Sequence, residues 1–341
     1  MRVSRIAVVV IVMLAVGCGG STALRSGKVY YEKNKDYPKA EEWLRKAVVE
    51  EPNSWEAHLY LGLALAQQEK YDEAAKVFKK ARELAPEAKK TLVYDNQRSF
   101  FVTLYNKGIT LNSTMNYREA AESFEKAVAI DPDDPKGFVN LGVAYSMLGE
   151  NDKALQAFKH AVEADSSSVD GWRNLGITYQ AMREFGLAKE AFSKVVELAP
   201  DDTDGLFSLG DMYFNEKEYE KALQSYIQAA ETRGDDATLQ YQIGASYFSL
   251  EEYGDATRAF QKAAALAQDS DEDLYKDTMF NLGVAYIKLQ EYDAAIATLE
   301  RVLEIEETVE LHEMLGAAYS KKGMKDKAIK EFERAKELSG E

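Results

Sequence analysis

A glycine that recurs mostly every 34 residues constrains the fold of this chain more than any other feature. An alanine follows each glycine after twelve residues, and a large ring or a leucine follows after sixteen. A period of this length and residue order is the signature of a two-helix repeat that must stack on its neighbours to bury a core. The glycines are Gly62, Gly108, Gly142, Gly176, Gly210, Gly244, Gly283 and Gly316.

Local signals predict helices throughout and indicate no strand, because apolar and polar residues do not alternate convincingly. Short oxygen acceptors predict the starts of the second helices, at Asp72, Asn151, Asp255 and Asp293. Prolines, which cannot continue a helical ladder, predict helix ends at Pro52, Pro86, Pro132 and Pro200. The glycines should lie where helices cross, and the rings should fill the space between successive helix pairs. The expected fold class is all-α.

The fifth period shows the residue pattern most fully, as Trp172, Leu175-Gly176, Tyr179, Ala188, Phe192, Val195 and Pro200. This order resembles the tetratricopeptide repeat (TPR) family and departs from it only at Val195. The resemblance implies a right-handed superhelix, or α-solenoid, of about nine helix-turn-helix repeats over residues 21–341. In the first repeat Lys28 stands in place of the glycine. The expected repeats are 21–54, 55–88, 101–134, 135–168, 169–202, 203–236, 237–270, 276–308 and 309–341.

Two inserts, residues 89–100 and 271–275, interrupt the period. The first contains neither glycine nor proline, so it is predicted to lengthen a helix. It would then either change the superhelical pitch locally or form a lip that closes one edge of a groove.

The N-terminus resembles that of a bacterial lipoprotein. Arg2 and Arg5 precede an apolar run, Ile6 to Val16, that is too short to span a bilayer. Gly17 and then Cys18, the only cysteine, follow it. Residues 1–17 are therefore expected to be a signal peptide, and residues 18–20 a lipidated N-terminus with acyl chains such as palmitate on Cys18. Gly19 resembles the outer-membrane sorting pattern, which predicts an outer-membrane location facing the periplasm of the bacterial envelope. The alternative is a non-lipidated signal anchor.

The strong negative charge excludes some classes of partner. Removal of residues 1–17 takes away two arginines and no acid, so the formal net charge of −16 becomes −18. Such a chain repels nucleic acid and anionic lipid headgroups. We therefore expect no nucleic acid partner, and membrane attachment through the lipid anchor only.

Neither an enzyme nor a cofactor protein is indicated. His58, His160 and His312 fall in separate repeats, and no carboxylates accompany them at metal spacing. The acidic turns do not fit a calcium loop. The chain has no glycine-rich loop for a nucleotide either, because the repeat uses the glycines. We expect no catalytic residue, no metal and no cofactor.

Function must then lie at positions that the repeat does not use for packing. In the family, the sixth residue of each first helix faces the concave groove, and here most of these residues are amides. An amide both donates and accepts, so a ladder of them can pair with an extended peptide backbone; alternatively, they only solvate a helix face. The sixth positions hold Asn106, Asn140, Asn174, Ser208, Gln242 and Asn281.

The fifth and twelfth positions of the later repeats hold large apolar side chains. Pairs seven residues apart share one helix face, so three neighbouring helices should align them into an apolar strip. Such a strip usually marks a partner site, although packing of the superhelix is an alternative use. The strip is Phe207, Phe214, Tyr241, Phe248, Phe280 and Ile287.

The sequence thus favours a protein-binding scaffold or assembly factor of the cell envelope, whose groove holds an envelope protein or peptide. Two alternatives remain open. One is an adaptor that delivers substrates to an envelope protease or a peptidoglycan enzyme. The other is a structural array that self-assembles as a homo-oligomer. The basic clamp by which some family members hold chaperone tails is excluded, because Lys136 and Arg173 do not match its positions.

Overall fold

The computed structural model describes residues 20–340, and these residues form α-helices, one π-helical turn and no strand. The predicted all-α solenoid is therefore confirmed. The chain divides into two compact units, residues 1–182 (unit 1) and 183–341 (unit 2). The expected signal peptide and Cys18 lie outside the described residues. No helix within residues 20–340 combines the length and the apolar character that a membrane span requires.

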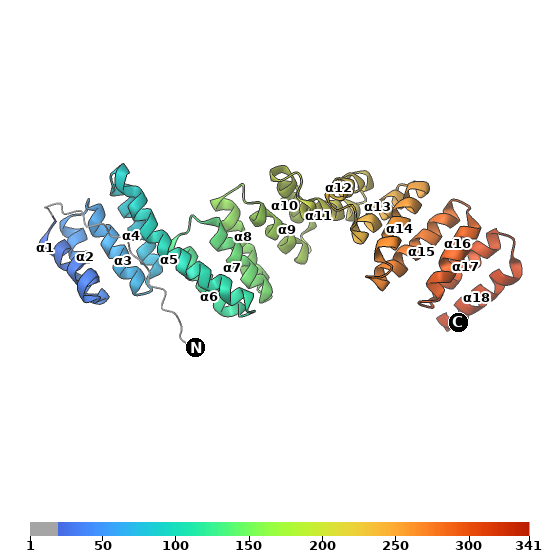
Figure 1. The fold of residues 1–341 in the computed structure, drawn as a ribbon, viewed down its shortest axis with the longest axis horizontal. Coiled ribbons are helices and arrows are strands. Elements are labelled where there is room, and N and C mark those ends of the chain that lie inside the picture. The colour runs from blue at the N-terminus through green and yellow to red at the C-terminus, as the bar shows by residue number, and fades with distance from the viewer. Residues whose placement is uncertain (1–19, 341) are drawn as a thin grey trace. The chain divides into compact units, whose positions relative to one another are not determined.

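In unit 1 the first helices α1, α3, α5 and α7 each pack against the second helix that follows, and successive pairs pack against one another (Figure 1). First helices also contact one another, as α5 contacts α7 and α7 contacts α9. The elements are α1 (Thr22–Val29), η1 (Tyr30–Asn34), α2 (Tyr37–Glu50), α3 (Trp55–Gln67), α4 (Tyr71–Leu84), α5 (Glu87–Ser113), α6 (Tyr117–Ile130), α7 (Pro135–Met147), α8 (Asn151–Ala164) and α9 (Val169–Ala181).

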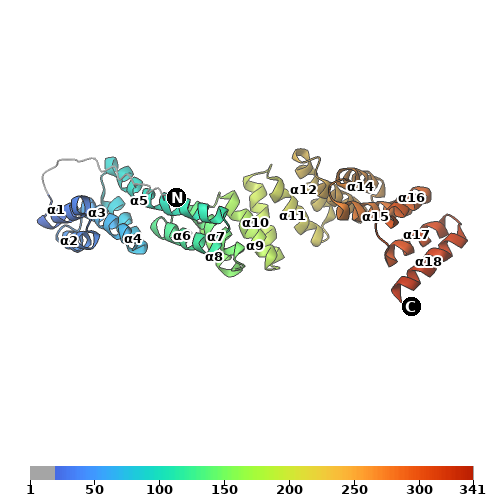
Figure 2. The ribbon, with the colours of Figure 1, turned by 60° about the horizontal axis from the view of Figure 1, so that its bottom comes forward.

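Unit 2 repeats this arrangement from α10 onward, and Figure 2 shows its pairs following one another toward the C-terminus. The first helices α13, α15 and α17 contact in turn. The elements are α10 (Phe185–Leu198), α11 (Thr203–Asn215), α12 (Tyr219–Thr232), α13 (Ala237–Ser249), α14 (Tyr253–Ala267), α15 (Glu272–Lys288), α16 (Tyr292–Leu303), α17 (Val309–Lys321) and α18 (Lys325–Ser339).

The recurring glycine lies directly under the ring of its own helix pair. A Cβ on Gly142 would lie 2.5 Å from the Phe158 ring, and one on Gly244 would lie 2.6 Å from the Phe260 ring. Both rings are only 1% exposed. The rings therefore pack within a helix pair, onto the glycine. A side chain at the glycine would separate the two helices.

The first repeat follows the same rule in a shifted register. Gly27, not Lys28, lies under the equivalent side chain, because a Cβ on Gly27 would be 2.5 Å from Leu44 Cγ. Gly27 precedes Leu44 by 17 residues, one more than the 16 between glycine and ring elsewhere. The π-helical turn η1 absorbs the additional residue, since it holds more residues per turn than an α-helix. The expectation that Lys28 replaces the glycine is wrong.

The predicted caps of the second helices are also wrong. Asp72, Asp255 and Asp293 lie inside the first turn, and Asn151 is already helical. The chain enters these helices from a left-handed residue, such as Gly149 with φ 74°, and the capping residues make no side-chain bond to the helix. Acids in the first turn instead stabilise these helices through the helix dipole. Side-chain caps occur on the first helices, as where Ser168 Oγ accepts from Gly171 N at 3.2 Å.

Residues 89–100 lie inside α5, which confirms that the first insert lengthens a helix. Its inner face belongs to the core, because Val93 and Gln97 are fully buried. Gln97 Nε2 donates to the carbonyl oxygen of Ile130, and Arg98 forms an ion pair with Asp131 at 3.4 Å. The insert therefore holds the turn between α6 and α7. Residues 271–275 cap and begin α15, where Asp271 accepts from Leu274 N.

Candidate protein-interaction surfaces on the first helices

The apolar residues predicted in unit 2 lie on its first helices and are all half-buried. Four of their rings pack against an aromatic ring of the second helix in the same pair. Phe207 lies 5.7 Å from Tyr226, and Tyr241 lies 5.8 Å from Phe260, between centroids. Phe214 and Phe248 each meet the tyrosine that begins the second helix, Tyr219 and Tyr253, both edge-on at 5.3 Å. One side of each ring is thus fixed by packing, and the remainder faces solvent.

The structure divides this apolar set into two adjoining groups. Tyr241, Phe248, Phe280 and Ile287 pack against the core cluster that contains Phe260 and Leu299. Phe207 and Phe214 pack against the preceding cluster, which contains Tyr226. Tyr247 contacts both clusters and joins them. We call the six predicted residues together the aromatic face of unit 2.

The predicted amides use their donors internally at two positions, one in each unit. Asn140 Nδ2 donates to Tyr105 Oη and to the Lys136 carbonyl oxygen, both at 3.0 Å. Asn281 Nδ2 donates in the same way to Tyr241 Oη at 3.1 Å and to the carbonyl oxygen of Asp277 at 3.0 Å. Both amide hydrogens are consumed in each case. Peptide binding by these two amides stays a prediction, and in this arrangement Oδ1 is the atom that is left for a ligand.

The tyrosines in these links supply the missing donor. Each phenol oxygen accepts from an asparagine of the next first helix, so its own hydrogen is left to donate. Burial, with a further contribution from Asp134, raises the pKa of Tyr105. Burial, with a further contribution from Asp277, raises the pKa of Tyr241. The phenols therefore keep their protons at neutral pH, and each Tyr–Asn link combines a donor hydroxyl with an acceptor amide oxygen.

The other predicted amides are less constrained by neighbours. Asn106 is exposed on α5, and Asn174 Nδ2 donates to the carbonyl oxygen of Asp170 on its own helix at 2.8 Å. Gln242 is half-buried beside Tyr241 on α13. Asn106, Asn140 and Asn174 lie at the same register position of α5, α7 and α9, which contact one another in order. They therefore form a row across unit 1.

Sequence reasoning missed an aliphatic row in unit 1. Ile109 and Ile177 are 37% and 49% exposed, and Val143 between them is half-buried. Each lies three residues after an asparagine of the amide row, which places it on the same helix face one turn on. Their spacing of 34 residues was a visible signal. We call the amide and aliphatic rows together the Asn–Ile face of unit 1.

A pocket of about 180 Å³ adjoins the aromatic face between α15 and α17. Its apolar residues are Phe280, Val302 and Leu311, and the latter two are buried. Three carboxylates and one ammonium surround them, so we call it the acidic pocket. Its polar residues are Lys276, Asp277, Glu306, Thr308 and Glu310.

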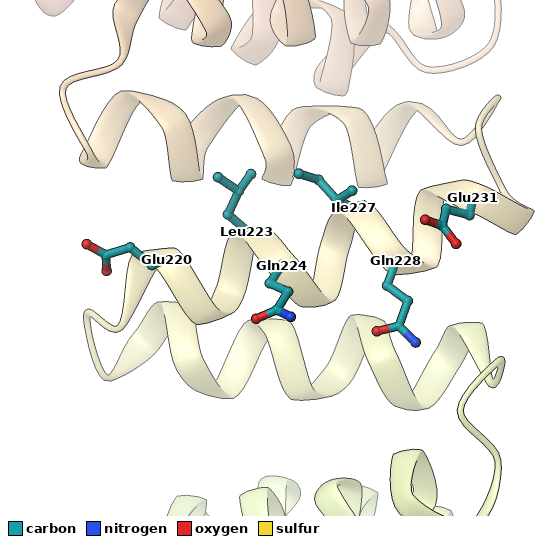
Figure 3. Close-up of a pocket in the computed structure, with 6 residues that line it drawn as sticks. All are labelled: Glu220, Leu223, Gln224, Ile227, Gln228 and Glu231. Atoms are coloured by element: carbon teal, nitrogen blue, oxygen red, sulfur yellow. The ribbon is translucent and has the colours of Figure 1, made fainter.

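A larger hollow of about 470 Å³ lies on the second helix α12, away from the predicted residues. Leu223 and Ile227 point to one side of α12, and Gln224 and Gln228 point to the other (Figure 3). Gln228 Nε2 donates to the carbonyl oxygen of Pro200 at 3.0 Å, so its amide is used in packing. The hollow runs along one helix and brings no ionisable groups together at its centre. We therefore place the candidate site on the first helices.

The histidines have structural partners. His58 Nδ1 lies 2.9 Å from the Ser54 carbonyl oxygen. His312 is buried between Glu331, 2.6 Å from Nδ1, and Glu307, 3.0 Å from Nε2. Hydrogen bonds from Arg334, and then from His312, lower the pKa of Glu307 to about 2. Within the part of the chain that the structure describes, no three His, Cys, Asp or Glu residues are arranged to hold a metal ion.

Stacked helix pairs with a glycine under a ring define a repeat solenoid. Family models described as tetratricopeptide repeat match residues 24–89 and 173–238, residues 135–168 and 309–341, and residues 235–308. A TPR repeat model matches residues 116–149. The chain belongs to the tetratricopeptide repeat family.

Several solved structures are similar to this chain, and the first of those named here shows the same fold. The crystal structure of YrrB, described as a TPR protein with an unusual peptide-binding site, is 23% identical with a TM-score of 0.52, and the match covers 59% of this chain and 99% of that chain. A crystal structure of MamA is 28% identical with a TM-score of 0.45, covering 49% of this chain and 95% of that chain. A tetratricopeptide repeat protein from Parabacteroides merdae ATCC 43184 is 18% identical with a TM-score of 0.49, covering 70% and 93%. Comparison with curated proteins gives no match.

Proposed function

We propose that this protein is a non-enzymatic scaffold or assembly factor that binds a polypeptide segment on the first helices of its two units. We further propose that lipid on Cys18 holds it in a bacterial cell envelope, in the outer membrane facing the periplasm. The observation that carries the binding proposal is the aromatic face of unit 2. Its residues repeat on successive first helices and keep part of their surface open to solvent.

The packing of these rings suits them to act as anchors. Phe214 and Phe248 are each fixed by edge-on contact with a tyrosine, so little side-chain freedom is left to lose on binding. Half-buried aromatic side chains with a polar surround are also the side chains that dominate binding energies at protein interfaces. The aromatic face is therefore proposed to bind apolar side chains of the partner.

The Asn–Ile face is proposed to bind an extended backbone. The Tyr105–Asn140 link offers a hydroxyl donor and an amide acceptor, which match the carbonyl and N–H groups of a peptide. Ile109 and Ile177 offer apolar contact without a requirement for a particular sequence. YrrB, described as a TPR protein with an unusual peptide-binding site, supports peptide binding by analogy of fold.

The binding proposal predicts that Phe214→Ala with Phe248→Ala abolishes partner binding while the helical content is kept. Truncating the best aromatic anchors costs about 2 kcal/mol or more each. Asn140→Ala with Asn174→Ala should weaken binding less, since each lost hydrogen bond is worth about 0.5–1.5 kcal/mol. The measurement is crosslinking and affinity capture from membranes, with partners quantified by mass spectrometry and folding by circular dichroism.

The matched control for these variants is Phe185→Ala with Ile227→Ala, since these side chains are 46% and 40% exposed on second helices. This control should capture as much partner as the wild type. If the phenylalanine pair folds and captures the same partners in the same amounts, the aromatic face is not the binding surface. If that pair unfolds the protein, the rings belong to the core and the proposal fails.

The anchoring proposal predicts that Cys18→Ser prevents lipidation and leaves an uncleaved precursor or a soluble periplasmic form. The reason is that Cys18 is the only thiol in the chain that could carry the acyl chains. Metabolic labelling with a radioactive fatty acid, followed by membrane fractionation, measures both effects. A wild-type protein that takes up no label would refute the anchor and leave the binding proposal unaffected.

A further inference from the structure

The acidic pocket combines an apolar floor with an excess of negative charge. Phe280 belongs both to the pocket and to the aromatic face, so the two surfaces are continuous. Val302 and Leu311 are 4% and 1% exposed and close the floor. Asp277 and Glu310 are exposed at its rim. An anionic or purely apolar ligand would meet carboxylates that it cannot satisfy.

The single cation of the pocket is already paired. Lys276 Nζ lies 2.6 Å from Glu306 and 3.3 Å from Asp273. Glu306 therefore has a partner, whereas neither Asp277 nor Glu310 forms an ion pair within residues 20–340. The positive end of the α17 dipole is also occupied, because Thr308 caps it and Glu310 lies in its first turn. Two carboxylates at the rim are thus left for a cation from outside.

Unit 2 contains a second aspartate at the repeat position of Asp277, and this aspartate shows which group pairs with a carboxylate there. Asp204 lies six residues before Gly210, and Asp277 lies six residues before Gly283, so the two aspartates share a register. Asp204 forms an ion pair with Arg233, which lies fourteen residues after Tyr219. Fourteen residues after the equivalent Tyr292 the chain has Glu306 instead. Where the sequence has a guanidinium for Asp204, it thus has a further carboxylate for Asp277, and Glu306 lines the same pocket as Asp277.

We propose that the acidic pocket receives the cationic side chain of a lysine or an arginine from the bound polypeptide. The aliphatic stem of that side chain packs on Phe280, Val302 and Leu311, and its charge meets Asp277 and Glu310. Long basic side chains bury an apolar stem and keep a charged end at the rim, which is the shape of this pocket. The inference deepens the proposed function and rests on it, since it names one residue type in the partner segment.

The test uses arginine amide as the probe and citrulline amide as the matched control, because citrulline amide keeps the α-amino group and carries a neutral ureido group in place of the guanidinium. The full chain is labelled at leucine and valine methyl groups, so Val302 and Leu311 report from the pocket floor by NMR. Arginine amide should shift these two methyl signals until the shift saturates at high probe concentration, and citrulline amide should not shift them. Asp277→Asn with Glu310→Gln should weaken the binding of arginine amide about fivefold, since exposed ion pairs are individually modest. Asp204→Asn is the control variant and should leave it unchanged.

Each outcome bears on the pocket separately from the proposed function. Equal shifts with citrulline amide, shifts spread over unrelated methyl groups, or unchanged affinity in the double variant would each overturn the proposal. Those results would leave the capture experiment with Phe214 and Phe248 untouched. Conversely, if the variant with Phe214→Ala and Phe248→Ala captures as much partner as the wild type, the proposed function is refuted even where the methyl shifts appear. Because Asp277 and Glu310 are exposed, the double variant should fold, and its melting temperature verifies this.

Discussion

Units 1 and 2 are built by the same packing rule but present different first-helix faces. Gly142 lies under Phe158 in unit 1 as Gly244 lies under Phe260 in unit 2. Outside that rule the units diverge. The ninth position of the first helices is aliphatic in unit 1, as in Ile177, whereas in unit 2 it includes Asp211, which accepts a hydrogen bond from Tyr226 at 2.6 Å.

This difference separates what builds the stack from what meets a partner. The glycine and the ring beneath each crossing are needed wherever two helices approach closely, so both units share them. The fifth and twelfth positions are not needed for that approach, and unit 2 places its aromatic face there. A family with one architecture and many partners is expected to place specificity at such positions.

The largest expected effect is on the free energy of unfolding, and it tests the packing of a buried ring on the repeat glycine, which both units share. Gly142→Ala and Gly244→Ala should each destabilise the protein by about 1–3 kcal/mol, because the added Cβ displaces a buried ring. Chemical denaturation followed by circular dichroism gives the change, and hydrogen exchange assigns it to a unit. Similar losses in both units would support one rule for both.

The control for these variants is Gly254→Ala, since a Cβ on this helical glycine would meet nothing within 4 Å. It should be neutral or should stabilise the protein by up to about 1 kcal/mol, through helix propensity alone. If Gly142→Ala or Gly244→Ala behaves like Gly254→Ala, the ring contact does not limit the approach of the helices.

A smaller effect tests the two Tyr–Asn links described above, Tyr105–Asn140 in unit 1 and Tyr241–Asn281 in unit 2. Tyr105→Phe and Tyr241→Phe should each cost about 0.5–1.5 kcal/mol, because each removes the phenol oxygen that accepts from an asparagine of the next first helix. Denaturation of the single variants and of the double variants with Asn140→Ala or Asn281→Ala measures the coupling. Additive effects of tyrosine and asparagine would show that the link carries no energy.

Much of the fold could be predicted from the sequence, because the period records contacts within and between neighbouring repeats. The glycine at Gly142 and the ring at Phe158 are sixteen residues apart and meet in the same helix pair. The first repeat shows where this logic fails. A π-helical turn shifted the register by one residue, and only the packing of Leu44 on Gly27 reveals it. Helix caps were misplaced because those four second helices begin at or before the predicted residues, and their actual capping residues, such as Glu150, make no side-chain bond.

The candidate surfaces were less predictable for a different reason. Their positions in the repeat placed Phe248 and Asn281 on the first helices. The repeat could not show that Asn281 donates both amide hydrogens internally. The row of Ile109, Val143 and Ile177 was visible as a period and was overlooked. The acidic pocket depends on side chains of α15, α16 and α17 together with the turn before α17, so no single helix pattern contains it.

The most direct test of the central claim is photo-crosslinking from the two kinds of helix face. A benzoylphenylalanine is introduced at Phe248, on the aromatic face, and separately at Ile227, which is 40% exposed on α12. The protein is irradiated in membranes, and adducts are identified by mass spectrometry. The account predicts that Phe248 yields a discrete partner adduct and that Ile227 does not. An adduct from Ile227, with none from Phe248, would contradict it.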